Sequence, residues 1–256
     1  MKRLLVVIPA KTIGGLLGAL ITITFLSCKE DDAAPGICRI QSIVNINDGV
    51  TRTEQFEYNE GIISSYFASA QLPDGREFQI TGVPSYDDEG RLIRIRVSDD
   101  HYTEVNYSDN KMEVINNNPI RSLAPQTYLL NEQNQIIELE GAIRYEYNES
   151  GQLIRTFNLF GSEPFLQFEY EYDNSTNPLQ GVLLTGLLVI DQDPFMTINP
   201  VFNFQAGPNN LVKSTRYDQL GQILSEVTFD WEYNELGLPV SFEGESRMSS
   251  YTYECR

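Results

Sequence analysis

A short motif that specifies a β-hairpin recurs about eight times along the chain. Its fullest copy is Tyr-Asp-Asp-Glu-Gly-Arg-Leu at residues 86–92. Further copies lie at 147–153, 217–223 and 233–238, with shortened copies at 58–62 and 107–112, a degenerate one at 130–136 and an extended one at 172–179. Internal repetition of this kind constrains a fold more than any local propensity does.

Each position of the motif has a physical reason. The aromatic residue ends a strand, the Asp or Asn side chain hydrogen-bonds the turn backbone, and Gly or Asn tolerates the positive φ that a tight turn requires. Aromatic and polar residues alternate before the turns, for example at 144–147 and 169–172, and return strands such as 92–97 alternate as well. This period of two predicts antiparallel strands with one buried face and one solvated face.

The sequence therefore predicts an all-β fold, an antiparallel meander of hairpins that forms a twisted, strongly curved sheet or a partly closed barrel. One segment departs from the pattern. Asn177 and Pro178 are typical of a helix start, and residues 179–190 are almost wholly apolar. We expect a short helix near 178–188, or a buried strand, that covers the sheet; the alternative is an exposed apolar surface for a partner.

The N-terminal region has the layout of a secretory signal. Lys2 and Arg3 precede an apolar run from Ile13 to Leu26, which is shorter than the roughly 20 residues of a membrane-spanning helix. We expect a signal peptide at 1–27, with a permanent membrane anchor as the alternative. The charged residues after Cys28 favour a flexible acidic tether at 28–37, followed by a single β domain at 38–256.

Two resemblances follow from these residues. Phe-Leu-Ser-Cys at 25–28 resembles the lipobox of bacterial lipoproteins, which implies that Cys28 is lipidated; an ordinary signal with a chance cysteine is the alternative. Cys-Lys-Glu-Asp-Asp at 28–32 resembles the export signal of Bacteroidota surface lipoproteins, which favours a surface-exposed position on the outer membrane over a periplasmic one. Residues 86–92 match the signature of YD repeats, found as successive β-hairpins in Rhs-type proteins, and the whole pattern resembles Bacteroidota lipoproteins with domains of unknown function.

The net charge limits the binding partners that the chain can have, and the cysteine content predicts a disulfide. Removing residues 1–27 removes three bases and no acid, so the formal charge falls from −18 to −21. Such a field repels nucleic acid, which is excluded as a partner; the membrane is expected to be contacted through the lipid anchor. With Cys28 lipidated, Cys38 and Cys255 remain, and an oxidising compartment favours a disulfide between them over two free thiols.

No catalytic constellation is visible, so we expect the protein not to be an enzyme. The only histidine, His101, is expected at the surface in a polar turn, and a histidine-rich zinc site is excluded by count. No cofactor is expected. Calcium ligands could come from the acids at 87–89 or from Asp191 with Asp193, but solvated turns are the favoured interpretation.

An aromatic row on one strand, Phe229, Trp231 and Tyr233, could stack on sugar rings if exposed and belongs to the core if buried. The favoured function is a surface-tethered, non-catalytic binding or scaffold module, for glycans or for envelope proteins. Two alternatives remain open. One is an envelope polysaccharide hydrolase that uses two carboxylates, and the other is a structural or adhesive spacer.

Overall fold

The computed structural model divides the chain into two units, residues 1–36 and 37–256. It describes residues 38–118, 124–161, 163–177, 179, 207–244 and 247–255. The predicted signal peptide, the lipidation site Cys28 and the tether lie outside the described residues. So does the helix predicted near 178–188, apart from Leu179, which is buried. The described residues contain no helix, and hence none that is long and apolar enough to cross a bilayer.

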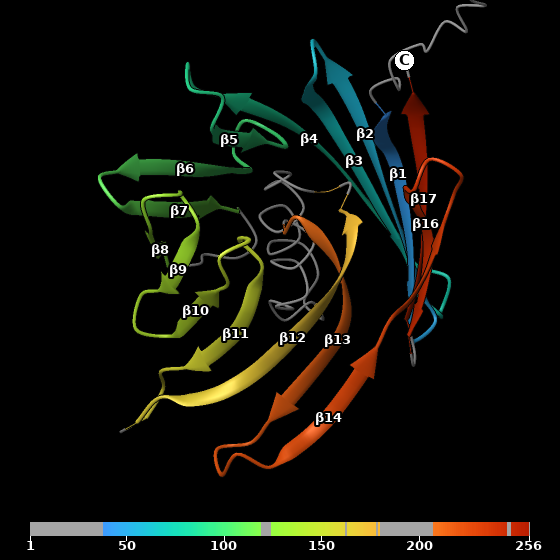
Figure 1. Ribbon diagram of the computed structural model, residues 1–256. Coiled ribbons are helices and arrows are strands. Elements are labelled where there is room, and N and C mark those ends of the chain that lie inside the picture. Colours follow the sequence, from blue (N-terminus) through green and yellow to red (C-terminus); the bar gives the residue numbers. More distant parts are fainter. Residues whose placement is uncertain are drawn as a thin grey trace, which may run out of the picture. The chain divides into compact units, whose positions relative to one another are not determined.

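Seventeen strands make up the described part of the second unit (Figure 1). In chain order they are β1 (Cys38–Asn47), β2 (Val50–Asn59), β3 (Ile62–Gln71), β4 (Glu77–Tyr86), β5 (Leu92–Arg96), β6 (Tyr102–Ser108), β7 (Lys111–Asn117), β8 (Gln126–Leu130), β9 (Ile136–Leu139), β10 (Ile143–Tyr147), β11 (Leu153–Asn158), β12 (Phe165–Thr176), β13 (Asn209–Tyr217), β14 (Ile223–Thr228), β15 (Asp230–Tyr233), β16 (Pro239–Gly244) and β17 (Arg247–Cys255).

The strands form an antiparallel meander that nearly closes into a barrel, which confirms the predicted fold class. Successive strands pair with one another except β14 and β15, and β17 returns to pair with β1. The sheet turns a corner at two places. The first half of β4 pairs with β3 and its second half with β5. At the other corner β14 pairs with β13 and, beyond Phe229, β15 pairs with β16.

The two ends of the domain are joined covalently. Cys38 of β1 and Cys255 of β17 are direct cross-strand partners, and they form a disulfide with their Cα atoms 4.0 Å apart. The predicted disulfide is therefore present, and the first and last strands are neighbours as expected.

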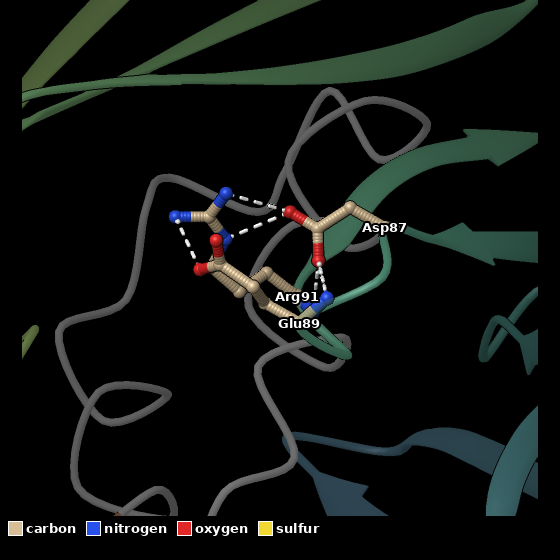
Figure 2. Close-up of polar contacts among 3 residues, drawn as sticks. All are labelled: Asp87, Glu89 and Arg91. Carbon is tan, nitrogen blue, oxygen red and sulfur yellow. Dashed lines mark hydrogen bonds and ion pairs between the residues drawn. The ribbon is translucent and has the colours of Figure 1, made fainter.

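The hairpin turns are held by the side chain that follows the aromatic residue. Asp87 accepts hydrogen bonds from the backbone N–H groups of Glu89 (3.0 Å) and Arg91 (2.8 Å), while Gly90 adopts a φ of +77°. The Arg91 guanidinium pairs with Asp87 (2.7 Å) and Glu89 (3.2 Å), as Figure 2 shows. The same two backbone-to-side-chain bonds recur at Asn131, Asn148, Asp218 and Asn234. The turn part of the motif is thus a side-chain-locked loop, as its residues predict.

Seven hairpins also share a β-bulge that the sequence pattern alone does not predict. In the fullest copy Tyr86 pairs with Leu92 and Ser85 with Arg94, so Ile93 has no cross-strand partner. The equivalent unpaired residues in the other six hairpins are Ser64, Ile137, Ile154, Val212, Leu224 and Val240. Such a bulge shifts the side-chain alternation by one residue and increases the local twist, which helps the sheet to curve.

The repeats are linked by their tyrosine hydroxyl groups. The Tyr86 hydroxyl donates to the carbonyl of Ile63 (3.1 Å), the residue that pairs with Tyr58 of the preceding hairpin. Tyr58, Tyr147, Tyr172 and Tyr253 make equivalent bonds. For Tyr147, Tyr172 and Tyr253 the acceptor is the carbonyl of the residue that pairs with the end of the preceding hairpin's strand. For Tyr58 the acceptor is the carbonyl of a residue that pairs with the last strand, β17. We call these five residues the tyrosine ladder. Because these five residues bind a neighbour's backbone, each of them joins its own hairpin to an adjacent one.

Candidate functional site

The tyrosine ladder is interrupted between β13 and β15. Tyr217 and Tyr233 occupy the same motif position as the ladder tyrosines, but their hydroxyls donate to carboxylates instead of to backbone carbonyls. Tyr217 donates to Glu169 (2.6 Å), and Tyr233 donates to Asp173. The hydrogen bond between Tyr217 and Glu169 lowers the pKa of the Glu169 carboxyl and raises the pKa of the Tyr217 hydroxyl. The repeat therefore changes its chemistry at these two hairpins.

The only tryptophan fills one of the vacated places in the ladder. The Trp231 indole N–H donates to the carbonyl of Leu211 (2.7 Å), and Leu211 is the cross-strand partner of Tyr172. That carbonyl is the one a ladder tyrosine of the next hairpin would reach. With Trp231 on that carbonyl, the hydroxyl of Tyr217 in the next hairpin donates to Glu169 instead, and the hydroxyl of Tyr233 in the hairpin after it donates to Asp173.

Asp173 belongs to the extended copy of the motif, and it closes a much longer turn. Its Oδ1 accepts from the N–H of Ser175 (3.0 Å), two residues on, as in the short turns. Its second bond comes from the N–H of Asn210 (3.0 Å), which precedes Leu211, the partner of Tyr172. In a short turn that bond comes from four residues on. The stretch between Ser175 and Asn210 is therefore an insertion within one hairpin turn, with the ends of that turn preserved.

Polar side chains converge on this turn base; we call Asp173, Asn209, Asn210, Tyr233 and Gln152 the Asp173 cluster. Asn210 Nδ2 lies 3.3 Å from the Tyr233 hydroxyl and 3.5 Å from Asp173 Oδ2. Asn209 Nδ2 donates to the carbonyl of Ser175 (3.1 Å), and its Oδ1 accepts from Gln152 Nε2 (2.9 Å). Gln152 lies in the turn before β11, and the other four residues lie on β12, β13 and β15. Their spacing in the sequence therefore does not predict that they are neighbours.

The cluster combines buried and accessible parts. Asn210 is 2% exposed, whereas Tyr233 is 36% exposed. Burial and the adjacent Asp173 carboxylate raise the pKa of Tyr233, so its hydroxyl stays protonated and can donate. An amide nitrogen carries two donors, and within the described residues Asn209 and Gln152 each use only one of theirs. The site thus offers a carboxylate, spare amide donors and an exposed ring.

The three aromatic residues predicted as a ligand-binding row differ in their exposure to solvent. Phe229 is buried, with its ring 5.4 Å from that of Phe242, and Trp231 is half-buried with its ring 4.8 Å from the same phenylalanine. Both belong to or pack against the hydrophobic core. Tyr233 is the exposed member. Ligand binding by the row stays a prediction, and Tyr233 is the residue in it that a ligand could reach without repacking the core.

One buried carboxylate lies on β2. Glu54 on β2 is 1% exposed and is the only buried acid among the described residues. Arg52 Nε lies 2.8 Å from Glu54 Oε1, and Arg52 also donates to the hydroxyl of the fully buried Tyr66 (3.2 Å). Burial raises the pKa of Glu54, and Arg52 partly opposes that shift. A hydrolase that uses two carboxylates needs a second acid at a suitable distance from the first. The contacts of Glu54 do not test this, and the enzyme alternative stays a prediction.

Two further sequence expectations can be placed. His101 is 9% exposed, so its predicted surface position is wrong; it lies in the tight turn between β5 and β6, where its carbonyl accepts from Val97 and Ser98. Of the predicted calcium ligands, Asp87 and Glu89 both pair with Arg91, so a cation would have to displace a guanidinium. Asp191 and Asp193 lie outside the described residues, and the described residues hold no group of three metal-ligating side chains.

A small hollow lies at the bulge in β1. It measures about 220 Å³ and is lined by Ile40, Gln41, Phe56, Glu57, Tyr58 and Glu254. Gln41 is the bulged residue, between Ile40 and Ser42 in the pairing with β17. The hollow lies near the disulfide end of β1, and it serves below as a control surface.

Comparisons with known proteins give only distant likenesses. No protein-family model matches the chain, and no curated protein matches it. The fold is similar to a porin-like protein from Bacteroides uniformis, with 13% identity, a TM-score of 0.48 and coverage of 83% of this chain and 96% of that one. A porin-like protein from Bacteroides vulgatus is similar over 85% of this chain and 99% of that one, with 11% identity and a TM-score of 0.37. The YD-repeat and lipoprotein-family resemblances therefore stay predictions.

Proposed function

We propose that the chain is an outer-membrane lipoprotein, anchored through Cys28 and exposed at the cell surface, whose barrel is a non-catalytic module that binds a glycan at the Asp173 cluster. The observation that carries the binding part is the interrupted tyrosine ladder. Five tyrosines of the ladder bind backbone carbonyls, whereas Tyr233 donates to Asp173 and lies beside Asn210.

The disulfide supports the export part of the proposal. Disulfides persist in extracytoplasmic compartments and are rare in the cytosol, and this one joins Cys38 to Cys255 at the two ends of the domain. Cys38 comes ten residues after Cys28, so a lipid on Cys28 would hold the barrel close to the membrane surface by a short tether.

The composition of the cluster supports a saccharide as the ligand. Sugar hydroxyl groups both donate and accept, and carboxylate and amide side chains satisfy both roles. An exposed aromatic ring adds an apolar surface for the C–H face of a sugar. The cluster holds all three kinds of group, whereas most surface acids elsewhere lie in ion pairs or turns, such as Glu169 with Arg155 (2.9 Å).

The anchor is tested in intact cells. Metabolic labelling with a fatty acid should mark the wild-type chain and fail with Cys28→Ala, and protease added to intact cells should digest the anchored protein. A chain that takes up no lipid, or that becomes accessible only after the outer membrane is disrupted, would contradict the corresponding part of the proposal.

Binding is tested with a glycan array, with the whole chain purified from membranes in detergent. We expect at least one glycan to bind, and its signal to be lost with Tyr233→Ala and retained with Gln41→Ala in the control hollow. The array is repeated with and without calcium, and we expect calcium to make no difference. A silent array, or equal loss in both variants, would refute glycan binding at this cluster.

A further inference from the structure

Strand β14 has the surroundings of a docking edge. It is hydrogen-bonded along one side to β13, and it is the strand at which the sheet turns its second corner (Figure 1). None of its six residues is buried, and five of them are exposed. A strand in a barrel ordinarily buries one of its two faces, because successive side chains point to opposite sides. On β14 only Val227 packs against the core, and the other five residues are exposed.

Large apolar side chains gather at this exposed strand. Ile223 and Leu224 of β14 are 57% and 56% exposed. Leu220, in the turn before β14, is 82% exposed. Most of the other exposed large apolar residues stand in other hairpins. An apolar group concentrated at a strand edge is a feature that proteins ordinarily avoid unless a partner covers it.

The edge lacks two of the features that usually prevent strand addition, proline and lysine, although it is short and bulged at Leu224. Natural edge strands carry lysine or proline, or are short and bulged. Strand β14 reads Ile-Leu-Ser-Glu-Val-Thr, with no proline and no base.

The charge around the edge selects the partner. Residues 217–243 contain six acids and no lysine or arginine: Asp218, Glu226, Asp230, Glu232, Glu235 and Glu243. Within the described residues Glu226 alone among the six forms an ion pair, with Lys213 of β13 at 2.7 Å. A second copy of this chain would bring the same acids together, whereas a cationic segment would neutralise them.

We propose that β14 is a docking edge for an extended, basic polypeptide segment, which adds as a strand beside β14. Backbone N–H and C=O groups of β14 hold the segment, the apolar side chains at Ile223 and Leu224 pack against its alternate residues, and the acids nearby meet its lysine or arginine side chains. Strand addition gains affinity from main-chain hydrogen bonds and specificity from alternate side chains. This interaction is separate from glycan binding at the Asp173 cluster.

The test is fluorescence anisotropy with the whole chain in detergent and a labelled octapeptide of alternating lysine and valine. Two further probes separate the contributions: the same peptide N-methylated on alternate amides, which keeps charge and apolar surface but loses backbone donors, and an alternating glutamate and valine peptide. We expect the first peptide to bind, the N-methylated one to bind about tenfold more weakly or worse, and the acidic one not to bind.

The chain supplies a matched pair of variants. Leu224→Lys places a charge on the free edge, and Ile93→Lys places one at the equivalent bulge position of β5, which is paired on both sides. We expect Leu224→Lys to weaken the lysine–valine peptide about tenfold or more and Ile93→Lys to leave it within about twofold. Circular dichroism confirms that both variants are folded.

Four results would overturn the proposal. These are no binding of the basic peptide, equal binding of the N-methylated peptide, equal effects of the two lysine variants, and self-association that Leu224→Lys abolishes in the absence of peptide binding. Tyr233→Ala should leave peptide binding unchanged, so failure of the glycan proposal and failure of this one are distinguishable.

Discussion

Replacing Tyr172 by phenylalanine removes one hydroxyl of the tyrosine ladder and keeps the ring. In the folded chain that hydroxyl donates to the Leu153 carbonyl over 2.7 Å, and burial raises the pKa of Tyr172 well above its usual value. A hydrogen bond of this kind contributes about 1–1.5 kcal/mol, because the lost bond also leaves the carbonyl short of a partner. For a domain of this size, that corresponds to a fall in melting temperature of about 2–5 °C.

Urea unfolding followed by circular dichroism measures this loss directly. The control is Tyr102→Phe on β6, which also keeps its ring; its hydroxyl has no hydrogen bond within the described part of the chain, and Arg94 contacts its ring instead. We expect the control to change the free energy of unfolding by less than about 0.5 kcal/mol, with the same m-value in both variants. If Tyr172→Phe is no more destabilising than Tyr102→Phe, the ladder does not stabilise the repeat.

Three further predictions concern the disulfide, the buried acid and alkaline pH. Replacing Cys38 and Cys255 by serine opens a closure of 217 residues and should lower the free energy of unfolding by up to about 5 kcal/mol; urea midpoints unchanged by the substitution would contradict this. Burial raises the pKa of Glu54 above 4.5, so its contribution to stability is fully present below that pH and is lost as the pH rises through the folded value. Glu54→Gln should therefore flatten the pH dependence of the urea midpoint above pH 4.5, and an unchanged slope would contradict it. Burial also raises the pKa values of Tyr58 and Tyr128 to about 12, so absorbance at alkaline pH should show them protonated until the fold is lost, and stability should fall between pH 10 and 12.

Local chemistry made the hairpin turns predictable. The Asx side chain and the following Gly or Asn act within five residues, so the sequence holds the whole interaction, and the structure repeats it from Asp87 to Asn234. The all-β meander follows from those turns, since short antiparallel connections leave few other topologies. The pairing of Cys38 with Cys255 was likewise expected from compartment and cysteine count.

Register was not predictable in the same way. Simple alternation along 92–97 puts Ile93 and Ile95 on the same buried face, but Leu92 and Ile95 are the buried residues and Ile93 is 36% exposed. The reason is the bulge at Ile93, which depends on pairing with β4. The motif's copies show the bulge only once their partners are known, because it is a property of two strands.

The Asp173 cluster was missed for a related reason. Asp173 and Tyr233 stand 60 residues apart, and a long insertion separates Asp173 from Asn210. One signal was present in the sequence. The extended copy at 172–179 lacks the Gly that should end its turn, which indicates that the turn is closed by a residue farther along the chain.

The most direct test of glycan binding is isothermal titration of the whole chain in detergent with a glycan that the array selects. We predict that Tyr233→Ala and Asp173→Ala each weaken the Kd about tenfold or more, since both remove a group that faces the ligand. Tyr253→Phe, which alters a ladder tyrosine bound to the Pro239 carbonyl, should leave the Kd unchanged. A Kd that the Tyr233 and Asp173 variants leave untouched would contradict a glycan site at the interrupted ladder.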